Sequence, residues 1–78
     1  MDSDNAGRIA APLRAARARR GITQEQLAAL SGISAQTISR IETGERDPRV
    51  GQLMRLAAAL RTAPSALLAE AVADEVVA

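Results

Sequence analysis

Arginine is the residue type in this chain with the greatest capacity for chemistry. The 78 residues contain ten arginines and no lysine. A guanidinium presents a planar fork of donors that matches phosphate oxygens and the edge of guanine. All ten arginines lie in residues 1–61 with six acids, whereas residues 62–78 hold three acids and no base. Residues 1–61 are therefore basic and residues 62–78 are acidic, although the net charge of the whole chain is only +1.

Missing residue types exclude several classes of site. The chain has no Cys and no His, so disulfides, thiolate metal sites, the commonest metal ligand and the commonest general base are all absent. The scattered Ser and Glu residues form no nucleophile–base set, so we expect no enzyme, no metal site and no cofactor. The lack of aromatic rings also removes stacking on single-stranded bases.

Size and composition indicate one small globular domain with an aliphatic core. Hydrophobic residues make up 47% and charged residues 24% of the chain. No apolar run reaches 18 residues, so no transmembrane helix is expected. Residues 1–6 are polar and acidic, unlike a signal peptide. We therefore expect a cytoplasmic protein that does not bind membranes.

Turn residues divide the chain into helical segments. Gly21, Gly32, Gly44, Pro48 and Pro64 punctuate a sequence dominated by Ala and Leu, and nothing between them alternates as a strand would. The pattern predicts five helices and no sheet. The expected ranges are about 6–19, 24–31, 35–43, 50–60 and 64–75. Proline at position 12 leaves two alternatives for the first: a regular helix starting near Arg8, or a bend at Pro12.

The second and third segments have the clearest start signals. Thr23 and Gln26 form a capping box, and Ser34 is the next N-cap. Only residues 31–33 separate the two helices. Two short helices joined by such a glycine turn are typical of a helix-turn-helix. Leu27, Ile33, Ile38 and Ile41 supply the apolar contacts between them, and the small residue Ala28 allows a close crossing.

The stretch LRAARARRGITQEQLAALSGISAQTISRIETGERDPRVGQLMRLAAAL resembles the phage-repressor/Cro-like, or Xre, family of helix-turn-helix regulators. The resemblance covers about residues 9–68. It depends on R-G-x-T-Q-E-x-L-A, S-G-I-S, I-x-x-I-E-x-G, R-x-P and L-x-x-L-A-x-A-L, in that order. It implies an all-α, lambda-repressor-like bundle of five helices, here one domain over residues 1–78 with a core at 6–68 and a helical tail at 69–78. Such bundles usually bind double-stranded DNA as dimers.

The resemblance also assigns roles to residues. The third helix enters the major groove, where Gln36 pairs with adenine, Arg40 with guanine and the methyl group of Ala35 suits thymine. Gln24 contacts phosphate at a helix N-terminus, and Arg46 lies beside the DNA backbone. The full expected set of DNA-contacting residues is Gln24, Ser34, Ala35, Gln36, Thr37, Ser39, Arg40, Thr43, Arg46 and Arg49. For Ser34 a purely capping role is the alternative, and for Gln36 and Arg40 a purely surface role.

Three further positions carry expectations. Glu42, usually acidic in the family, should pair with Arg17 or Arg46 and not touch DNA. Arg61 stands where the family often has glycine, which requires strain or a different helix end. Ala63 replaces a common capping Ser, so the last helix relies on Pro64. For the basic residues in 14–20, a solvated face is the alternative to any specific role.

The tail carries an apolar stripe. Leu67 and Ala71 can close the core, while Leu68, Val72 and Val76 recur every four residues on a second face. A two-fold partner would cover this stripe, and a frayed helix end is the alternative.

Together these observations predict a sequence-specific double-stranded DNA binder, a transcriptional regulator acting as a dimeric repressor. The alternative is an antitoxin-like or adaptor protein, whose tail binds a partner protein while DNA binding serves autoregulation. A short disordered arm beyond the bundle would favour the alternative, and this chain has little room for one.

Overall fold

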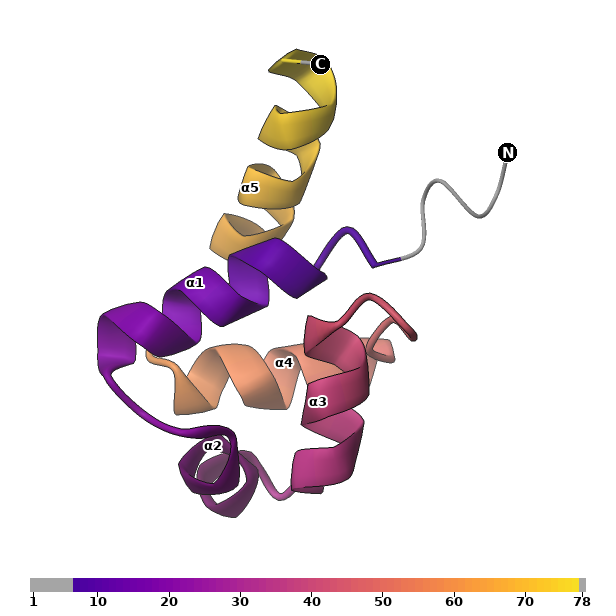
Figure 1. Ribbon diagram of the computed structural model, residues 1–78. Helices are drawn as coiled ribbons and strands as arrows, with labels where there is room; N and C mark the ends of the chain where they lie inside the picture. Colours follow the sequence, from indigo (N-terminus) through magenta and orange to yellow (C-terminus); the bar gives the residue numbers. More distant parts are fainter. Residues whose placement is uncertain (1–6, 78) are drawn as a thin grey trace.

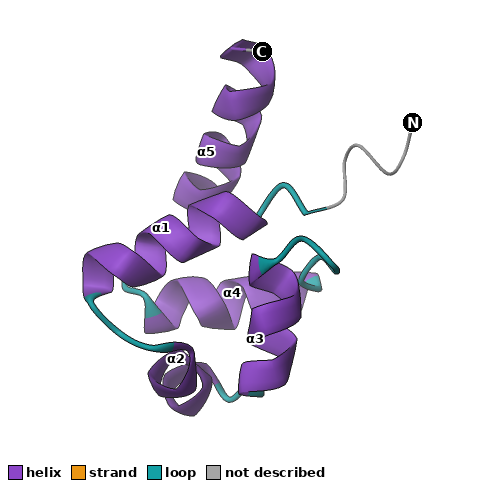
Figure 2. Cartoon of the chain, viewed as in Figure 1, coloured by secondary structure: helices purple, strands orange, loops and turns teal. Residues whose placement is uncertain are grey.

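The computed structural model describes the backbone of residues 7–77 and the side chains of residues 7–72. Over that backbone the chain forms five α-helices, and Figure 2 shows only loops and turns between them. The helices are α1 (Ala10–Arg20), α2 (Gln24–Ser31), α3 (Ala35–Glu42), α4 (Val50–Ala59) and α5 (Pro64–Val77). The predicted all-α architecture is confirmed. None of the described helices is both long and apolar enough to cross a membrane.

The five helices enclose one aliphatic core. In Figure 1 α1 lies above α4 and the C-terminal end of α3, while α5 extends away from α1. The packed pairs are α1 with α3 and α5, α2 with α3 and α4, and α4 with α5. The largest fully buried side chains are Leu13, Leu27, Ile38, Ile41, Leu56 and Leu67. Leu53 and Ala28 are only partly buried against this core.

Local capping signals determine where α2 and α3 begin. The Gln26 N–H donates to Thr23 Oγ1 at 3.0 Å, and the Thr23 N–H donates to Gln26 Oε1 at 2.8 Å. Both halves of the predicted capping box are therefore present. Between the helices Gly32 has a φ of 74°, which a residue with a Cβ rarely adopts. This turn directs α3 away from α2.

The start of α1 differs from the prediction. The helix begins at Ala10 rather than near residue 6, and Pro12 lies in its first turn. A proline there removes only an N–H that has no helical partner, so no bend is needed. The Ala10 N–H bonds to the carbonyl of Gly7, which has a φ of 78°.

A partly buried ion pair joins α1 to α3. The Glu42 side chain is only 2% exposed and receives two bonds from Arg17, Nε to Oε2 at 2.8 Å and Nη2 to Oε1 at 2.9 Å. The third nitrogen of Arg17 donates to the carbonyl of Ile22. Arg14 donates to the backbone carbonyl of Glu42. Of the two partners predicted for Glu42, the structure selects Arg17 over Arg46, and Arg17 is not part of a solvated face.

The ion pair keeps Glu42 ionised. Burial alone would raise the pKa of the Glu42 carboxyl, but hydrogen bonds from Arg17 and Gln24, with the charges of Arg17 and Arg14, hold that pKa below its usual range. The same contact raises the pKa of Arg17. Because the carboxyl pKa is lowered on folding, the pair stabilises the fold above the ordinary pKa of Glu, and this contribution is lost as the pH falls through the lowered value.

Arg61 is strained at the end of α4. Its φ of 57° makes it the one residue other than glycine with positive φ among residues 7–77. Its N–H bonds to the carbonyl of Ala58, and the Thr62 N–H bonds to that of Ala57, the pattern of a Schellman motif. Helix α4 therefore ends as a glycine-capped helix does, but with arginine in the position of the glycine. Of the two alternatives that the sequence left for Arg61, backbone strain or a different helix end, the structure shows the strain.

Arg17→Ala is expected to reduce the free energy of unfolding by about 3 kcal/mol, because it leaves a buried carboxylate without its main partner. The matched control is Arg19→Ala, which removes an exposed 3.4 Å pair with Glu70 and should cost less than about 1 kcal/mol. Chemical denaturation at pH 7 measures both. If both variants lose the same free energy of unfolding, the burial of Glu42 does not make its ion pair more important for stability than the exposed pair.

Glu42→Gln is expected to make the free energy of unfolding depend less on pH in the acidic range. In the parent chain, stability should fall as the pH drops below the ordinary pKa of Glu and through the lowered pKa of Glu42. The variant should be less stable than the parent at pH 7 and lose the difference in strong acid. Denaturation at a series of pH values checks this, and an unchanged gap at low pH would contradict it.

Arg61→Gly is expected to stabilise the chain by about 1 kcal/mol, since glycine adopts positive φ without strain. Arg61→Ala is the control, because it removes the same side chain but keeps the strain. Thermal unfolding of both variants separates the backbone effect from the loss of the guanidinium. A glycine variant no more stable than the alanine variant would show that position 61 carries no strain.

Candidate nucleic-acid interface

Helix α3 presents an apolar face to the core and a polar face to solvent. Ile38 and Ile41 are fully buried, whereas Gln36 and Arg40 are exposed. Residues four apart lie on one helix face, so Gln36 and Arg40 project side by side. An amide and a guanidinium in that arrangement can each form two hydrogen bonds with a base edge.

The N-terminus of α3 is capped by hydroxyl groups. The Thr37 N–H donates to Ser34 Oγ at 3.1 Å, and the Ser34 hydroxyl donates to Thr37 Oγ1 at 3.0 Å. The capping role predicted for Ser34 is confirmed. Because Thr37 Oγ1 is the acceptor of this pair, its own hydrogen remains available to a phosphate or base. Ala35, Thr37 and Ser39 are half-buried along the edge of the same face.

Gln24 links the start of α2 to the end of α3. Its Nε2 donates to Glu42 Oε1 at 3.0 Å, and its side chain is half-buried. This bond positions the amide group at the helix N-terminus and leaves one amide N–H for an outside acceptor. The phosphate contact predicted for Gln24 is thus compatible with its structural role, and it stays a prediction.

The carbonyl of Arg40 organises the loop after α3. It accepts the N–H groups of Glu45 at 2.9 Å and Arg46 at 3.3 Å, and the hydroxyl of Thr43 at 3.1 Å. The hydroxyl hydrogen of Thr43 therefore points back at the helix, so a phosphate contact by Thr43 would need this bond to break. Thr43 is the weakest member of the predicted set on this geometry.

Arg46 and Arg49 lie on the loop that follows. Arg49 is exposed, and its backbone N–H donates to Gln52 Oε1 at 3.0 Å at the start of α4. Arg46 is half-buried. Among the side chains of residues 7–72, neither of these arginines nor Arg40 forms an ion pair with a carboxylate. Their charges are available to an anionic partner such as the DNA backbone.

Gly7 supports this loop, and nothing in the sequence predicted that role. The Gly7 N–H donates to Asp47 Oδ1 at 2.8 Å, and a Cβ on Gly7 would lie 2.7 Å from the Cα of Gly44. Only glycine fits at such a backbone contact. The two glycines lie far apart in the chain, so no local pattern could have revealed the pairing.

No metal centre is found in the described part of the chain, where no group of three or more carboxylates is placed to hold an ion. The arrangement instead offers exposed amide, hydroxyl and guanidinium groups on α3 and the following loop. These groups can form hydrogen bonds and ion pairs but include no nucleophile with an adjacent base.

The comparisons with known proteins agree with this geometry. The helix-turn-helix family HTH_3 matches residues 13–67. The HTH-type transcriptional repressor RghR of Bacillus subtilis is 50% identical over 50 residues, which cover 63% of this chain and 37% of RghR. The clp gene regulator ClgR of Corynebacterium glutamicum superposes with a TM-score of 0.84 at 28% identity, over 90% of this chain and 74% of the ClgR chain.

A further solved structure, the restriction-modification controller protein C.AhdI of Aeromonas hydrophila, has a TM-score of 0.75 at 33% identity, covering 82% of this chain and 96% of that chain. The chain spans well under half the length of RghR, so the repressor activity of RghR as a whole is not transferred by this match. The match to residues 13–67 and the shared fold place the chain in HTH_3, the Xre/Cro-like helix-turn-helix family of DNA-binding transcriptional regulators, which are not enzymes.

Proposed function

We propose that the chain is a cytoplasmic, dimeric repressor that reads a specific double-stranded DNA site. The observation that carries the proposal is the exposed pair of Gln36 and Arg40 on the outer face of α3, with the Arg40 charge unpaired among the described side chains. The name of RghR, a transcriptional repressor, supports the sign of regulation. No cofactor is needed, because every group in the proposed contact belongs to the protein.

The proposed contacts fall into two classes. Gln36 and Arg40, with the methyl group of Ala35, read base edges in the major groove. Backbone phosphates are contacted by Gln24, Arg46 and Arg49, and by Thr43 once its bond to the Arg40 carbonyl breaks. The residues Ser34, Thr37 and Ser39 complete the predicted DNA-contacting surface of α3. The first class confers sequence preference, whereas the second confers affinity and its dependence on salt.

Dimerisation through α5 is the second part of the proposal. Leu68 and Val72 are 47% and 54% exposed. Both line a cavity of about 280 Å³ whose other lining residues are the apolar Ile9, Pro48, Leu53 and Ala71 and the charged Arg8 and Asp47. The side chain of Val76, the third predicted contact, lies outside the described residues. A partner's α5 would cover this face. Two modules are also what affinity requires, since one buries only about 600–1,000 Å² on DNA.

The function as a whole is tested by selecting bound fragments from a genomic DNA pool. Enrichment of one sequence, with two half-sites about 34 Å apart, is the result expected of a two-fold dimer. A pool that remains unenriched even at low salt would contradict DNA reading. Co-purification of a distinct protein bound to α5 would favour the adaptor alternative over the homodimer.

Arg40→Ala and Arg46→Ala are expected to weaken DNA binding in different ways. Arg40→Ala removes a bidentate pair, so cognate affinity should fall by about 1–3 kcal/mol and preference at one base pair should relax. Arg46→Ala should weaken cognate and scrambled duplexes alike and reduce the slope of log affinity against log salt by about one. Binding to both duplexes across a salt series measures these effects.

The two variants control for each other, since each removes one arginine with no ion-pair partner among residues 7–72. Thermal stability should hardly change in either. If Arg40→Ala weakens both duplexes equally, Arg40 contacts phosphate and not a base. If it unfolds the chain, the recognition face must be assigned to other residues.

Leu68→Glu combined with Val72→Glu is expected to yield a monomer, because two charges cannot be covered by an apolar partner face. Ala69→Glu is the matched control, since Ala69 is exposed on the same helix and lies outside the stripe. Sedimentation measures the mass, and circular dichroism checks that helicity persists. A double variant that stays dimeric would place the interface elsewhere on the molecule.

A further inference from the structure

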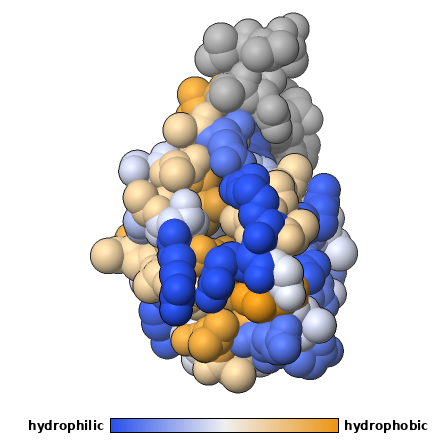
Figure 3. Space-filling model, turned by 90° about the vertical axis from the view of Figure 1, so that its left-hand side faces the viewer, coloured by the Kyte–Doolittle hydropathy of each residue, from blue (hydrophilic) through white to orange (hydrophobic). Residues whose placement is uncertain are grey.

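A second basic surface lies away from α3, where α1, α2 and α4 end. Figure 3 views the molecule from this side and shows strongly hydrophilic side chains set around smaller hydrophobic patches. The surface contains an open cavity of about 410 Å³. Its lining residues are Arg20, Leu30, Ser31, Arg55, Ala58, Ala59 and Arg61. None of them belongs to the proposed DNA contacts.

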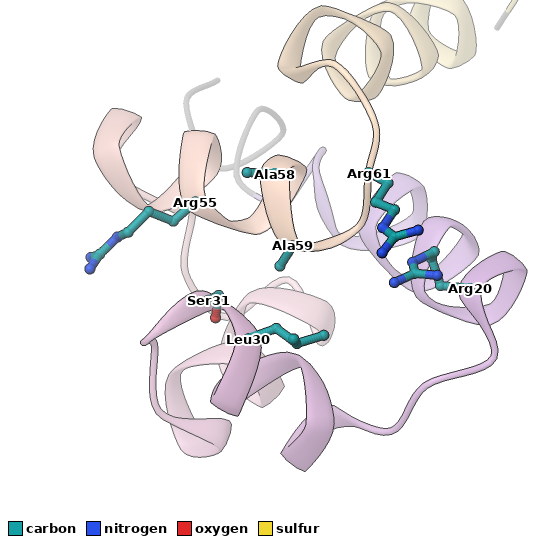
Figure 4. A pocket seen from close by; sticks show the side chains of 7 residues that line it. All are labelled: Arg20, Leu30, Ser31, Arg55, Ala58, Ala59 and Arg61. Carbon is teal, nitrogen blue, oxygen red and sulfur yellow. The ribbon is translucent and has the colours of Figure 1, made fainter.

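Two of the arginines face one another across this cavity. Arg20 is the last residue of α1, Arg61 follows α4, and Figure 4 shows their guanidinium groups turned toward each other. Arg55 extends away from them, on the other side of the cavity. Neither Arg20 nor Arg61 has an ion-pair partner among the side chains of residues 7–72. Two like charges that face one another across a cavity attract an anion placed between them.

The Nε atom of Arg20 gives independent support. It is buried and has no hydrogen-bond partner among the described atoms. Nearly all buried donors in folded proteins have a partner, and an exception calls for an explanation such as an absent ion. The C-terminal dipoles of α1 and α4 compensate part of the positive charge, but they do not separate the two guanidinium groups. A donor shielded from water competes less with solvent for a hydrogen-bond acceptor, so the unpartnered Nε favours an anion at this cavity.

Leu30, Ala58 and Ala59 form an apolar part of the cavity wall, beside Ser31 and Arg55. Leu30 is 58% exposed. In Figure 4 its side chain lies near Ala59 and extends toward the end of the cavity where Arg20 and Arg61 lie. A ligand that places a charged group on the arginines would lay its carbon skeleton over these side chains. Such a combination of a fork of donors and an apolar wall suits an organic anion better than an inorganic one.

We propose that Arg20 and Arg61 bind the carboxylate or phosphate group of a small organic anion, whose carbon skeleton packs on Leu30 and Ala59. This site goes beyond the proposed DNA reading and uses different residues. It also gives the strained arginine at position 61 a role, since the left-handed backbone there aims the guanidinium at Arg20.

The test measures thermal unfolding of the full chain with added pentanoate, acetate, inorganic phosphate or chloride, all at equal ionic strength. The proposal predicts a saturable rise in Tm with pentanoate that exceeds the rise with acetate. The rise should reach about 6–11 °C once the anion exceeds its Kd tenfold. A rise with phosphate above that with chloride would identify the phosphate form of the ligand. In ¹⁵N NMR spectra, the Arg20 Nε–H signal should shift with the same Kd.

Matched variants locate the effect. Arg20→Gln and Arg61→Gln should lose the anion-dependent rise in Tm, whereas Arg55→Gln should retain it, since Arg55 lines the cavity but points away from the pair. Arg61→Gly gives a second variant at that position without backbone strain, so loss of the rise there would not reflect poor folding.

Two outcomes would overturn the proposal. Equal rises in Tm in the parent and all variants would show a general salt effect. Weaker DNA binding by Arg61→Gln without any added anion would make the pair a contact to the DNA backbone. Both outcomes leave the proposed role of Gln36 and Arg40 untouched, so failure of this site is distinguishable from failure of DNA reading.

Discussion

The orientation of α3 depends on one buried carboxylate. Glu42 closes α3, and its two oxygens receive Arg17 from α1 and Gln24 from α2. Aliphatic contacts alone are non-directional and would hold α3 against the core in several rotations about its axis. A bidentate pair has a defined geometry. Because Ile38 and Ile41 face the same way as this pair, the opposite face, with Gln36 and Arg40, is held outward.

The elements that the sequence predicted well are those whose signals are local. Thr23, Gln26, Ser34 and Gly32 act within a few residues of themselves, and the observed ends of α2 follow them to the residue. The start of α1 was predicted too early, because its position depends on a contact between Gly7 and the loop at Gly44. A backbone contact across that separation in the chain leaves no periodic pattern to read.

The candidate site was predictable only in part, for a different physical reason. The ten arginines are chemically identical in the sequence, and their roles separate only when tertiary partners are known. Arg17 pairs with buried Glu42, Arg19 pairs with exposed Glu70, and Arg40 pairs with no carboxylate among residues 7–72. The reading of residues 14–20 as a solvated face was therefore wrong for Arg17. The family resemblance could assign Arg40 to the recognition helix. It could not tell which of the arginines in residues 14–20 form structural ion pairs.

The small core makes these polar contacts more consequential than they would be in a larger domain. A chain of this size buries a limited share of its surface, and without aromatic rings each core residue contributes a modest apolar area. Net stability is then only a few kcal/mol, and a cost of about 1 kcal/mol is a sizeable part of it. Strain at Arg61 and the unpartnered Nε of Arg20 are both costs of this kind, and they occur at one cavity. Two unrelated costs at one place are better explained by a ligand that offsets both than by two separate defects of packing.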